Sequence, residues 1–372
     1  MISDKVLILF PYEININNGG PSGFLAHNLL DKPRDCFVLS QDIIKTSPEK
    51  ITKKFDYLIK RILFLWKNRG KEKRKQKEEF FYKYYFEKSE AKNYRYIFFH
   101  ETIYFERFRK YISDNQVIIL QSHSPEIPSV EYRNWAPLNT EEISFREKAE
   151  KEAFKRADII VFPNEGCVSI YETLITDKNK IKYILSGAKK DYNNDGKNSY
   201  ELPEDKINLM YIGRRNKIKG FDIVLETFRK AREKRKDINL VIIGNGGKIS
   251  EEGITDIGFS KNPIGWYNSA DYLINANRQS YFDLSVIEAL TTGIPIIMSD
   301  NFGHSYYKGK SPLIKTFDVD SPDELYEILT GNLEKRDYRK TENMELYEKN
   351  LTDGCYYERF KKFVREIRDT EG

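Results

Sequence analysis

Short apolar runs alternate with stretches of helical periodicity along most of the chain. Runs that predict buried strands lie at 5–11, 36–40, 96–99, 117–121 and 158–163 in the first half, and at 207–213, 239–244, 271–275 and 295–299 in the second. Helical stretches lie at 24–30, 141–156, 221–234, 284–291 and 322–330, and a last one at 356–367. Strands that read as unbroken apolar runs are buried on both faces, so the pattern predicts an α/β protein with parallel sheets covered by helices.

The alternation lapses once, over a polar stretch rich in Gly, Asn, Asp and Pro between 186 and 205. Such a composition is typical of a linker, and 372 residues suffice for about two domains. We therefore predict an N-terminal domain at 1–188, a linker at 189–205, a second α/β domain at 206–352 and a C-terminal helix at 353–372.

Composition excludes several classes of protein. Apolar residues make up 40% of the chain, with 25 Tyr and 23 Phe, which is enough for packed cores and too much for a disordered chain. No run of about 18 apolar residues predicts a membrane-spanning helix, and the first residues lack the pattern of a signal peptide. The 3 cysteines lie far apart, which favours the reducing cytoplasm over a disulfide framework or a zinc site.

One basic segment stands apart from the rest of the chain. Residues 50–95 hold 16 Lys or Arg against 6 Asp or Glu, a local net charge of +10 in a chain of net charge +5. An apolar helical stripe runs through its first part, formed by Phe55, Leu58, Ile59, Ile62, Leu63 and Trp66, and a Lys-rich run follows at 71–77. A basic amphipathic helix with Trp suits an anionic bilayer, so we predict peripheral contact with the inner face of the cell membrane. Packing of the helix on the N-terminal core and binding of nucleic acid stay open as alternatives.

Glycine-rich and basic turns follow several of the predicted strands. Gly19 and Gly20 lie between the first strand and a helix, where bare backbone and a helix N-terminus can approach a phosphate. Arg214 and Lys219 follow the strand at 207–213, at the edge where open α/β sheets bind ligands, and Arg can grip a phosphate with two hydrogen bonds. Asn245 follows the next strand in a Gly-rich turn with room for a base or ribose. An ordinary solvated turn remains the alternative for each.

The segment 281–290 runs from a turn into a helix. Backbone N–H groups of Leu284 and Ser285 would point at an anion, and the Glu288 carboxylate, one turn later, can accept from two neighbouring ribose hydroxyls. Asp283 fits a helix N-cap. His123 follows a predicted strand and would face the ligand edge of the first domain, although a structural histidine beneath a loop stays open. No hydrolytic triad, P-loop or metal-binding motif is present in the sequence.

Together these segments resemble the retaining glycosyltransferases of family 4, which have the GT-B fold. GRRNKIKGFDIVLETF at 213–228 resembles the family's G-R-x4-K-G stretch. SYFDLSVIEALTTGIPIIMS at 280–299 resembles its signature of two glutamates eight residues apart before a G-x-P strand, and the segments 157–166 and 180–191 resemble those that lead to the linker. The resemblance implies two Rossmann-like α/β/α domains that face each other across a cleft, with a C-terminal helix that returns to the N-terminal domain.

The resemblance also implies roles for individual residues. Arg214 and Lys219 would neutralise the diphosphate of the donor, and Glu288 would hold its ribose. Gly19 and Gly20 would approach the phosphate from the N-terminal domain.

His123 would lie near the reacting sugar carbon and stabilise the positive charge that develops there. The chain departs from the family pattern at two positions of the donor site. Ser280 stands where the first glutamate is expected, so contacts to the donor sugar must differ. Asp283 stands where a glycine is usual, and either supplies the missing carboxylate or caps the helix; we favour the cap.

The activity that the resemblance implies is a hexosyltransferase-type glycosyl transfer without metal or cofactor. A nucleotide-diphosphate sugar, of the UDP type, would donate a sugar to a glycan or lipid-linked hydroxyl with retention of configuration. The departing phosphate would take the acceptor proton while the domains close around the linker. Residue usage typical of AT-rich bacterial genomes suggests capsule or lipopolysaccharide synthesis. A non-catalytic GT-B binding protein or transferase chaperone, a nucleic-acid-binding protein, and a GT-B epimerase or phosphorylase remain alternatives.

Overall fold

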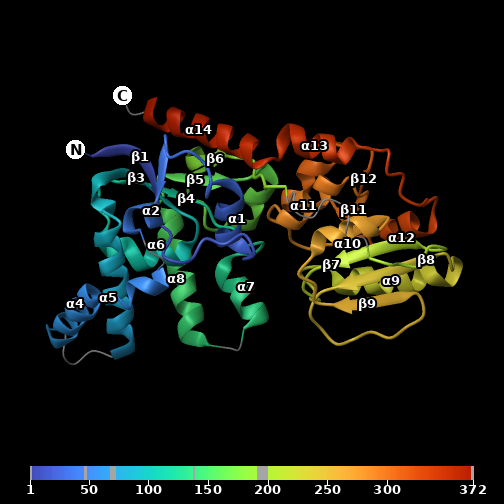
Figure 1. Cartoon of the computed structure of the whole chain (residues 1–372), viewed down its shortest axis with the longest axis horizontal. Helices are drawn as coiled ribbons and strands as arrows, with labels where there is room; N and C mark the ends of the chain where they lie inside the picture. The colour runs from blue at the N-terminus through green and yellow to red at the C-terminus, as the bar shows by residue number, and fades with distance from the viewer. Residues whose placement is uncertain (1, 46–47, 68–72, 137–138, 191–199, 370–372) are drawn as a thin grey trace. The chain divides into compact units, whose positions relative to one another are not determined.

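The computed structural model describes residues 2–45, 48–67, 73–136, 139–190 and 200–369. The chain forms two compact units (Figure 1). The first comprises Met1–Phe162, Ile170–Leu185 and Tyr356–Gly372, and the second comprises Pro163–Ser169 and Ser186–Cys355. Each unit is an α/β domain with its own sheet and core.

The first unit is built on a six-stranded sheet in the order β2-β1-β3-β4-β5-β6, and all of its strand pairs are parallel. Its strands are β1 (Ser3–Ile8), β2 (Phe37–Leu39), β3 (Tyr94–Phe99), β4 (Val117–Leu120), β5 (Ile159–Phe162) and β6 (Ile181–Tyr183). The central strands are almost wholly buried, as expected for a sheet that is covered on both faces.

Helices cover both faces of this sheet. The helices of this unit are α1 (Gly20–Asn28), α2 (Ser40–Ile44), α3 (Pro48–Ile51), α4 (Phe55–Lys67), α5 (Lys73–Lys88), α6 (Thr102–Phe108), α7 (Pro128–Trp135), α8 (Thr140–Arg156) and α14 (Asp353–Asp369), of which α4 packs on α5. α1 and α14 share one apolar cluster with the sheet, in which Tyr356, Phe360 and Val364 are buried. Figure 1 shows α6 and α8 on the opposite side of the sheet. The apolar period at 356–367 therefore marks a helix that packs on the first unit, although it ends the chain.

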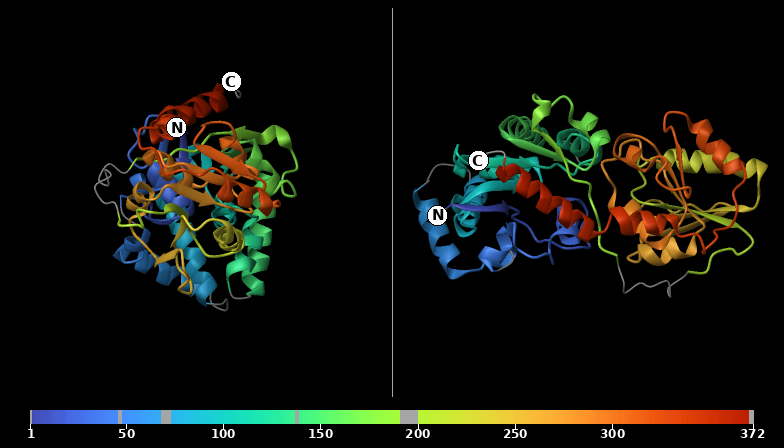
Figure 2. Two further views of the ribbon diagram at one scale, coloured as in Figure 1. Left: turned by 90° about the vertical axis from the view of Figure 1, so that its right-hand side faces the viewer. Right: turned by 90° about the horizontal axis from the view of Figure 1, so that it is seen from above.

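The second unit repeats this architecture with another six-stranded parallel sheet, in the order β12-β11-β10-β7-β8-β9. Its strands are β7 (Ile207–Ile212), β8 (Ile238–Ile243), β9 (Ile254–Gly258), β10 (Tyr272–Asn275), β11 (Ile296–Ser299) and β12 (Ile314–Phe317). Its helices are α9 (Phe221–Lys234), α10 (Pro263–Ser269), α11 (Leu284–Thr292), α12 (Pro322–Thr330) and α13 (Glu342–Asn350). α9 and α12 share an apolar cluster with one face of the sheet, and Figure 2 shows the strands between the helical layers.

The prediction of an α/β protein with parallel, helix-covered sheets is confirmed. Three strands were missed, namely β6, β9 and β12, and each is the edge of its sheet. An edge strand is covered less completely, so many of its residues are partly or wholly exposed and they do not form an unbroken apolar run. The helix predicted at 24–30 begins earlier, at Gly20, because Pro21 fits the first turn of a helix.

The units divide the chain close to the predicted boundaries at 188 and 206, but Pro163–Ser169 belongs to the second unit. Most of the predicted linker at 189–205, and the Lys-rich run at 71–77 in part, lie outside the described residues. Among the described residues, no helix has both the length and the apolar character that crossing a membrane requires.

Candidate active site

The carboxyl edge of the second sheet brings together the loops that follow β7, β8 and β10. Two glycines show how closely they meet. A Cβ atom on Gly244, at φ +146°, would lie 2.0 Å from the Gly213 carbonyl oxygen, and one on Gly220, at φ +63°, would lie 1.8 Å from that of Ala276. A side chain at either position would push the loops apart, so the glycines of the predicted turns are needed for this packing.

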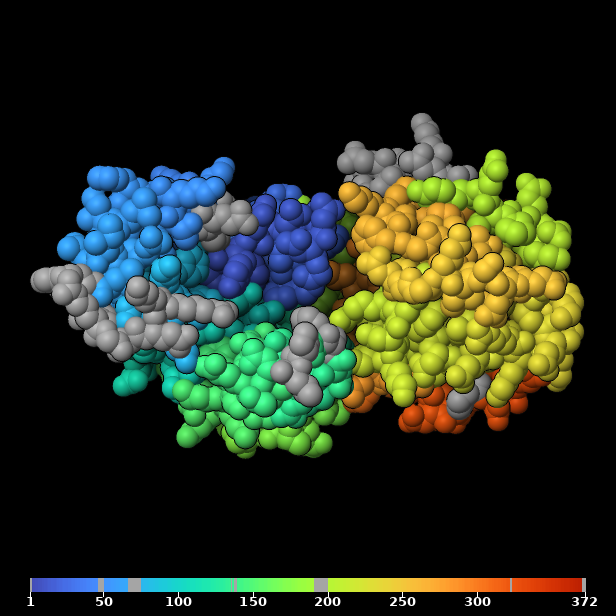
Figure 3. All heavy atoms as spheres, turned by 90° about the horizontal axis from the view of Figure 1, so that it is seen from below, coloured from blue at the N-terminus to red at the C-terminus, as the bar shows by residue number. Residues whose placement is uncertain are grey.

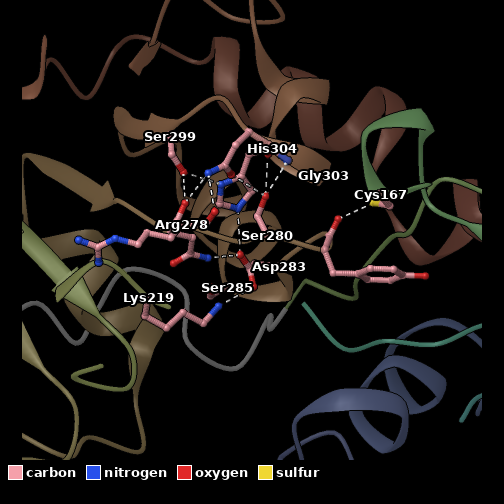
Figure 4. Close-up of polar contacts among 12 residues, drawn as sticks. Cys167, Lys219, Arg278, Ser280, Asp283, Ser285, Ser299, Gly303 and His304 are labelled. Atoms are coloured by element: carbon pink, nitrogen blue, oxygen red, sulfur yellow. Dashed lines mark hydrogen bonds and ion pairs between the residues drawn. The ribbon is translucent and has the colours of Figure 1, made fainter. Parts of the chain in front are cut away.

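Asp283 lies at the centre of the polar contacts at this edge (Figure 4). Its Oδ1 accepts a hydrogen bond from Lys219 Nζ at 2.8 Å, and its Oδ2 accepts from Asn277 Nδ2 at 2.6 Å. His304 Nε2 lies 2.9 Å from the same Oδ2. The loops after β7, β10 and β11 thus meet at one carboxylate before α11.

His304 is fully buried and engaged through both ring nitrogens. Its Nδ1 lies 3.3 Å from the Ser299 hydroxyl, which itself donates to the Asn277 carbonyl at 2.8 Å. The Asn301 side-chain amide donates to the same carbonyl at 2.9 Å. This set of bonds fixes the imidazole against Asp283 from the side opposite Lys219.

The electrostatics of Asp283 follow from these neighbours. Burial alone would raise the pKa of its carboxyl, but Lys219 and His304 outweigh burial and hold the pKa well below its ordinary value. The preference for Asp283 as a helix cap is wrong: it occupies the N-cap position of α11, but its side chain makes no capping hydrogen bond. Its oxygens accept instead from side chains of the neighbouring loops, because a cation and two polar side chains bind a carboxylate more strongly than one backbone N–H does.

Ser280 holds the loop that carries Asn301 and His304 through buried hydrogen bonds. It is fully buried, its Oγ donates to the Asn301 carbonyl at 2.8 Å, and it accepts from the backbone N–H of His304 at 3.1 Å. The side chain that replaces the family's first glutamate is therefore directed into the protein, where it holds the loop that carries His304. That contacts to a donor sugar differ at this position stays a prediction.

The two arginines of the turn after β7 differ sharply. Arg215 forms a bidentate ion pair with Asp256, at 2.5 and 2.7 Å, and their side chains are 6% and 2% exposed. Arg214 is exposed, and its carbonyl accepts from the Tyr211 hydroxyl at 2.6 Å. Arg214 is therefore the accessible arginine of the pair, and its role at the diphosphate stays a prediction.

Arg215 also places the Gly-rich loop after β8. Its guanidinium donates to the Gly247 carbonyl at 2.8 Å, and a Cβ on Gly246 would lie 2.5 Å from its side chain. The guanidinium holds the pKa of Asp256 below its usual value. Asn245 is exposed in this loop, as its predicted role requires.

Leu284 and Ser285 lie in the first turn of α11, and Glu288 lies in the second. Helix N-termini leave backbone N–H groups without intrahelical partners and carry partial positive charge, and the ammonium of Lys219 lies beside this one. Glu288, partly exposed one turn later, follows on the same helix. The predicted donor residues of the second unit thus belong to adjoining loops and one helix end.

The candidate histidine of the first unit, His123, follows β4 and lies beside His100, which follows β3. His123 Nε2 lies 2.9 Å from His100 Nδ1, and the Phe24 ring lies 4.5 Å from that of His123. Burial lowers the pKa of His123 to about 3, and burial together with His123 lowers that of His100. Both imidazoles are therefore neutral at pH 7, and one donates while the other accepts.

Gly19 is the N-cap residue of α1 and Gly20 is its first residue, and both lie in an open position. A Cβ atom at either would have no neighbour within 4 Å, and Gly20 has a φ of +62°. The roles that the resemblance gives to Gly19, Gly20 and His123 stay predictions.

Three polar residues of these sites were not singled out from the sequence. His304 follows a predicted strand, as His123 does, and this position after a strand is the feature of the sequence that could have identified it. His100 also follows a predicted strand, at 96–99, and is the bonded partner of His123. Glu101, at the start of α6, carries no sequence signal, and burial raises its pKa to about 7 despite Arg146. In the part of the chain that the structure describes, no three His, Cys, Asp or Glu residues form a metal-binding group.

Comparison with known protein families gives a match within the second unit. Residues 206–331 match the family model described as glycosyl transferases group 1. This match spans β7 to α12, including the loops that hold Lys219 and Asp283.

Two bacterial proteins resemble about a third of the chain. An uncharacterized 41.2 kDa protein in the cps region of Klebsiella pneumoniae is 30% identical over 135 residues, which cover 33% of this chain and 37% of that protein. The O-antigen biosynthesis glycosyltransferase WclY of Escherichia coli is 25% identical over 142 residues, covering 35% and 38%. The match thus spans less than two fifths of the length of these relatives.

Solved structures match over most of the chain. A sucrose-phosphate synthase from Thermosynechococcus elongatus is 16% identical with a TM-score of 0.58, covering 79% of this chain and 78% of its own. Anabaena HepE, in complex with UDP-glucose, is 12% identical with a TM-score of 0.55, covering 76% and 80%. The family model matches the second unit alone, and the solved structures show that the chain has the two-domain α/β fold known as GT-B.

Proposed function

We propose that the protein transfers a sugar from a nucleotide-diphosphate sugar to a glycan or lipid-linked hydroxyl. The observation that carries this proposal is the position of Lys219 beside the first turn of α11, with its ammonium 2.8 Å from the residue that precedes the helix. An ammonium group and a helix N-terminus at one point favour a phosphate group there. The same loop presents the exposed Arg214.

The proposed donor site continues from the phosphates to the nucleoside. Glu288, one turn into α11, would accept hydrogen bonds from the two ribose hydroxyls. Asn245 and the open Gly-rich loop after β8 would border the base or ribose. HepE is held in complex with UDP-glucose, and we propose UDP as the nucleotide of this donor as well.

The chemistry proposed is a transfer with retention, as in family 4. The bond between the anomeric carbon and the diphosphate oxygen breaks, the acceptor oxygen bonds to that carbon on the same face, and the acceptor proton passes to the departing phosphate. Lys219, Arg214 and the α11 N-terminus would stabilise the charge that develops on the diphosphate, without a metal. Such preorganised donors each contribute about 3 kcal/mol in comparable sites. His123 and the Gly19–Gly20 turn are proposed for the sugar and phosphate on the side of the first unit.

The proposed place of this reaction is capsule or lipopolysaccharide synthesis at the inner face of the cell membrane. The two bacterial relatives come from a cps region and from O-antigen biosynthesis, which supports a surface polysaccharide as the product. The donor would be supplied from the cytoplasm.

Calorimetric titration of the protein with UDP, GDP and ADP tests the donor site. We expect UDP to bind best, Lys219→Ala to weaken UDP binding by roughly 10- to 100-fold, and Glu288→Ala to do the same through the ribose. For Glu288→Ala the decisive ligand is 2′,3′-dideoxy-UDP, which should bind the variant and the wild type equally. Lys217→Ala, an exposed lysine of the same loop, and Glu226→Ala, an exposed glutamate of α9, serve as matched controls. Equal UDP affinity in Lys219→Ala and the wild type would overturn the site.

A non-catalytic GT-B binding protein or transferase chaperone is the second candidate, and the burial of Ser280 in place of the expected glutamate favours it. UDP release from UDP-sugars, with water or with an acceptor, separates the two. Turnover that is lost in Lys219→Ala excludes the non-catalytic protein, and UDP binding without turnover of any donor establishes it.

A further inference from the structure

Helix α4 turns an apolar face away from the unit that carries it. Phe55 is 78% exposed, Ile62 62%, Leu63 54% and Ile59 42%. The spacing of 55, 59, 62 and 63 places these four side chains on one side of the helix. Contiguous exposed apolar side chains of this size mark a contact surface, because single proteins rarely leave them in water.

The opposite side of α4 accounts for its packing. Tyr57 is buried, and its ring centroid lies 5.1 Å from those of both Phe80 and Tyr84 on α5. Phe64 packs on Phe80 at 5.4 Å. The helix is therefore held in place by α5. Packing on its own unit, the alternative to membrane contact, accounts for the side of the helix that carries Tyr57 and Phe64 but not for the opposite side. The outward apolar face needs another partner.

The side of α4 that flanks the apolar face is also tied to α5. Asp56 accepts from the Tyr84 hydroxyl at 2.9 Å and forms ion pairs with Lys60 and Lys88, each at 3.3 Å. The outward direction of the four apolar side chains is thus fixed by hydrogen bonds and ion pairs as well as by ring contacts.

The charge beside this face indicates what that partner is. Lys50, Lys53 and Lys54 are exposed and directly precede Phe55, and no carboxylate of the described residues pairs with any of them. Apolar side chains and unpaired cations side by side suit a bilayer with anionic headgroups, which offers acyl chains and phosphates together. Nucleic acid would use the lysines but leave the apolar face in water, and a second copy of this chain would bring the same lysines into mutual repulsion.

We propose that α4 lies flat on an anionic lipid bilayer, with Phe55, Ile59, Ile62 and Leu63 among the acyl chains and the preceding lysines against the headgroup phosphates. Figure 3 shows the blue atoms of this segment at the surface of the first unit. The inference deepens the proposed function, because it brings the enzyme to a lipid-linked acceptor. The membrane inference is tested by lipid binding and the proposed function by sugar transfer, so either of the two proposals can fail while the other stands.

Cosedimentation of the full chain with vesicles tests the proposal. We expect binding to vesicles of phosphatidylglycerol and phosphatidylcholine in equal parts, and none to phosphatidylcholine alone. Phe55→Ser with Ile62→Ser should weaken binding by roughly tenfold or more, since two large side chains no longer enter the bilayer. Lys53→Glu with Lys54→Glu should weaken it to a similar extent and flatten its dependence on salt.

Matched controls come from the second unit. Phe259→Ser removes a phenylalanine that is 64% exposed, and Lys230→Glu with Lys236→Glu reverses two exposed lysines. Neither should change binding. An unchanged melting temperature shows that the variants fold; if the Phe55 and Ile62 pair lowers it, Ile59→Ser with Leu63→Ser replaces that pair.

Three results would overturn the proposal. The first is no binding of the wild type to anionic vesicles, and the second is equal binding by the α4 variants. The third is self-association without lipid that disappears in the apolar variant, which would make the face a contact between copies of this chain.

Discussion

Lys219 Nζ lies 2.8 Å from Asp283 Oδ1, although the two residues are 64 positions apart in the chain. The contact joins the loop after β7 to the start of α11. Because His304 and Asn277 bind the other carboxylate oxygen, Asp283 determines where the ammonium stands before any ligand arrives. Asp283, at the position where the family 4 pattern has glycine, thus positions a lysine that we propose for the donor diphosphate.

The ion pair makes stability depend on acid in a defined direction. The folded pKa of Asp283 lies below its ordinary value of 3.8, so its stabilising effect is complete above that pH and is lost as the pH falls further. Asp283→Asn should reduce the free energy of unfolding by about 1–3 kcal/mol at neutral pH, and the difference should shrink below about pH 4. Denaturant titrations of both proteins across this range measure it. A difference that stays constant in acid would show that the charge of Asp283 contributes nothing.

Arg214 and Arg215 are adjacent, but replacing each by alanine should have opposite effects on stability and on UDP binding. Arg215→Ala leaves the buried Asp256 without its partner, and should destabilise the protein by about 3–5 kcal/mol. Arg214→Ala should leave stability nearly unchanged and weaken UDP binding. Denaturant titration and calorimetry on the same two variants measure both effects. If Arg215→Ala were as stable as the wild type and Arg214→Ala bound UDP normally, the assignment of the two arginines would be wrong.

The sequence predicted the central strands of both sheets, because these read as unbroken apolar runs, and the helices with a clear helical period, such as α8, α9 and α14. It did not predict α5, α6, α7, α10 and α13. It missed β6, β9 and β12, since half-covered edge strands mix apolar and polar residues. The turns of the candidate site could be singled out because glycines and cations after a strand have a physical reason to be there.

What could not be predicted are the contacts between distant loops. Nothing in the sequence near Asp283 shows that Lys219 and His304 will reach it, so a local rule assigned it to a helix cap. Burial of Ser280 likewise depends on the loop after β11, which lies 21 residues further on. Pairing of His100 with His123 follows from the parallel register of β3 and β4, in which Phe99 lies opposite Leu120.

The histidine pair gives a second dependence on pH. The folded pKa values of His100 and His123 are lowered, that of His123 to about 3, so below about pH 6.5 the unfolded chain binds protons that the folded chain does not. The contribution of this pair to the free energy of unfolding is complete above that pH. It falls as the pH drops toward 3, by up to about 1.4 kcal/mol per pH unit for each histidine. His123→Gln should make this fall less steep. Unfolding free energies at a series of pH values measure the slope, and an unchanged slope would contradict the enclosed, neutral state of His123.

Restoring the family's glutamate at Ser280 should harm this protein. Ser280 is fully buried, and a Cβ on the neighbouring Gly303 would already lie 1.5 Å from the Tyr281 carbonyl oxygen, so there is no room for a longer side chain. Ser280→Glu would also bury a second carboxylate near Asp283. We expect a loss of about 3 kcal/mol or more, against about 1–2 kcal/mol for Ser280→Ala, which removes only the hydrogen bonds.

The double variant Ser280→Glu with Asp283→Gly returns both positions to the family pattern and tests whether they are coupled. If the two carboxylates exclude each other, the double variant should lose less unfolding free energy than the two single variants lose together. The difference should be about 1 kcal/mol or more in a double-mutant cycle. Denaturant titration of the four proteins measures this coupling. Strict additivity would mean that the serine and the aspartate are independent departures, and that Asp283 does not stand in for the absent glutamate.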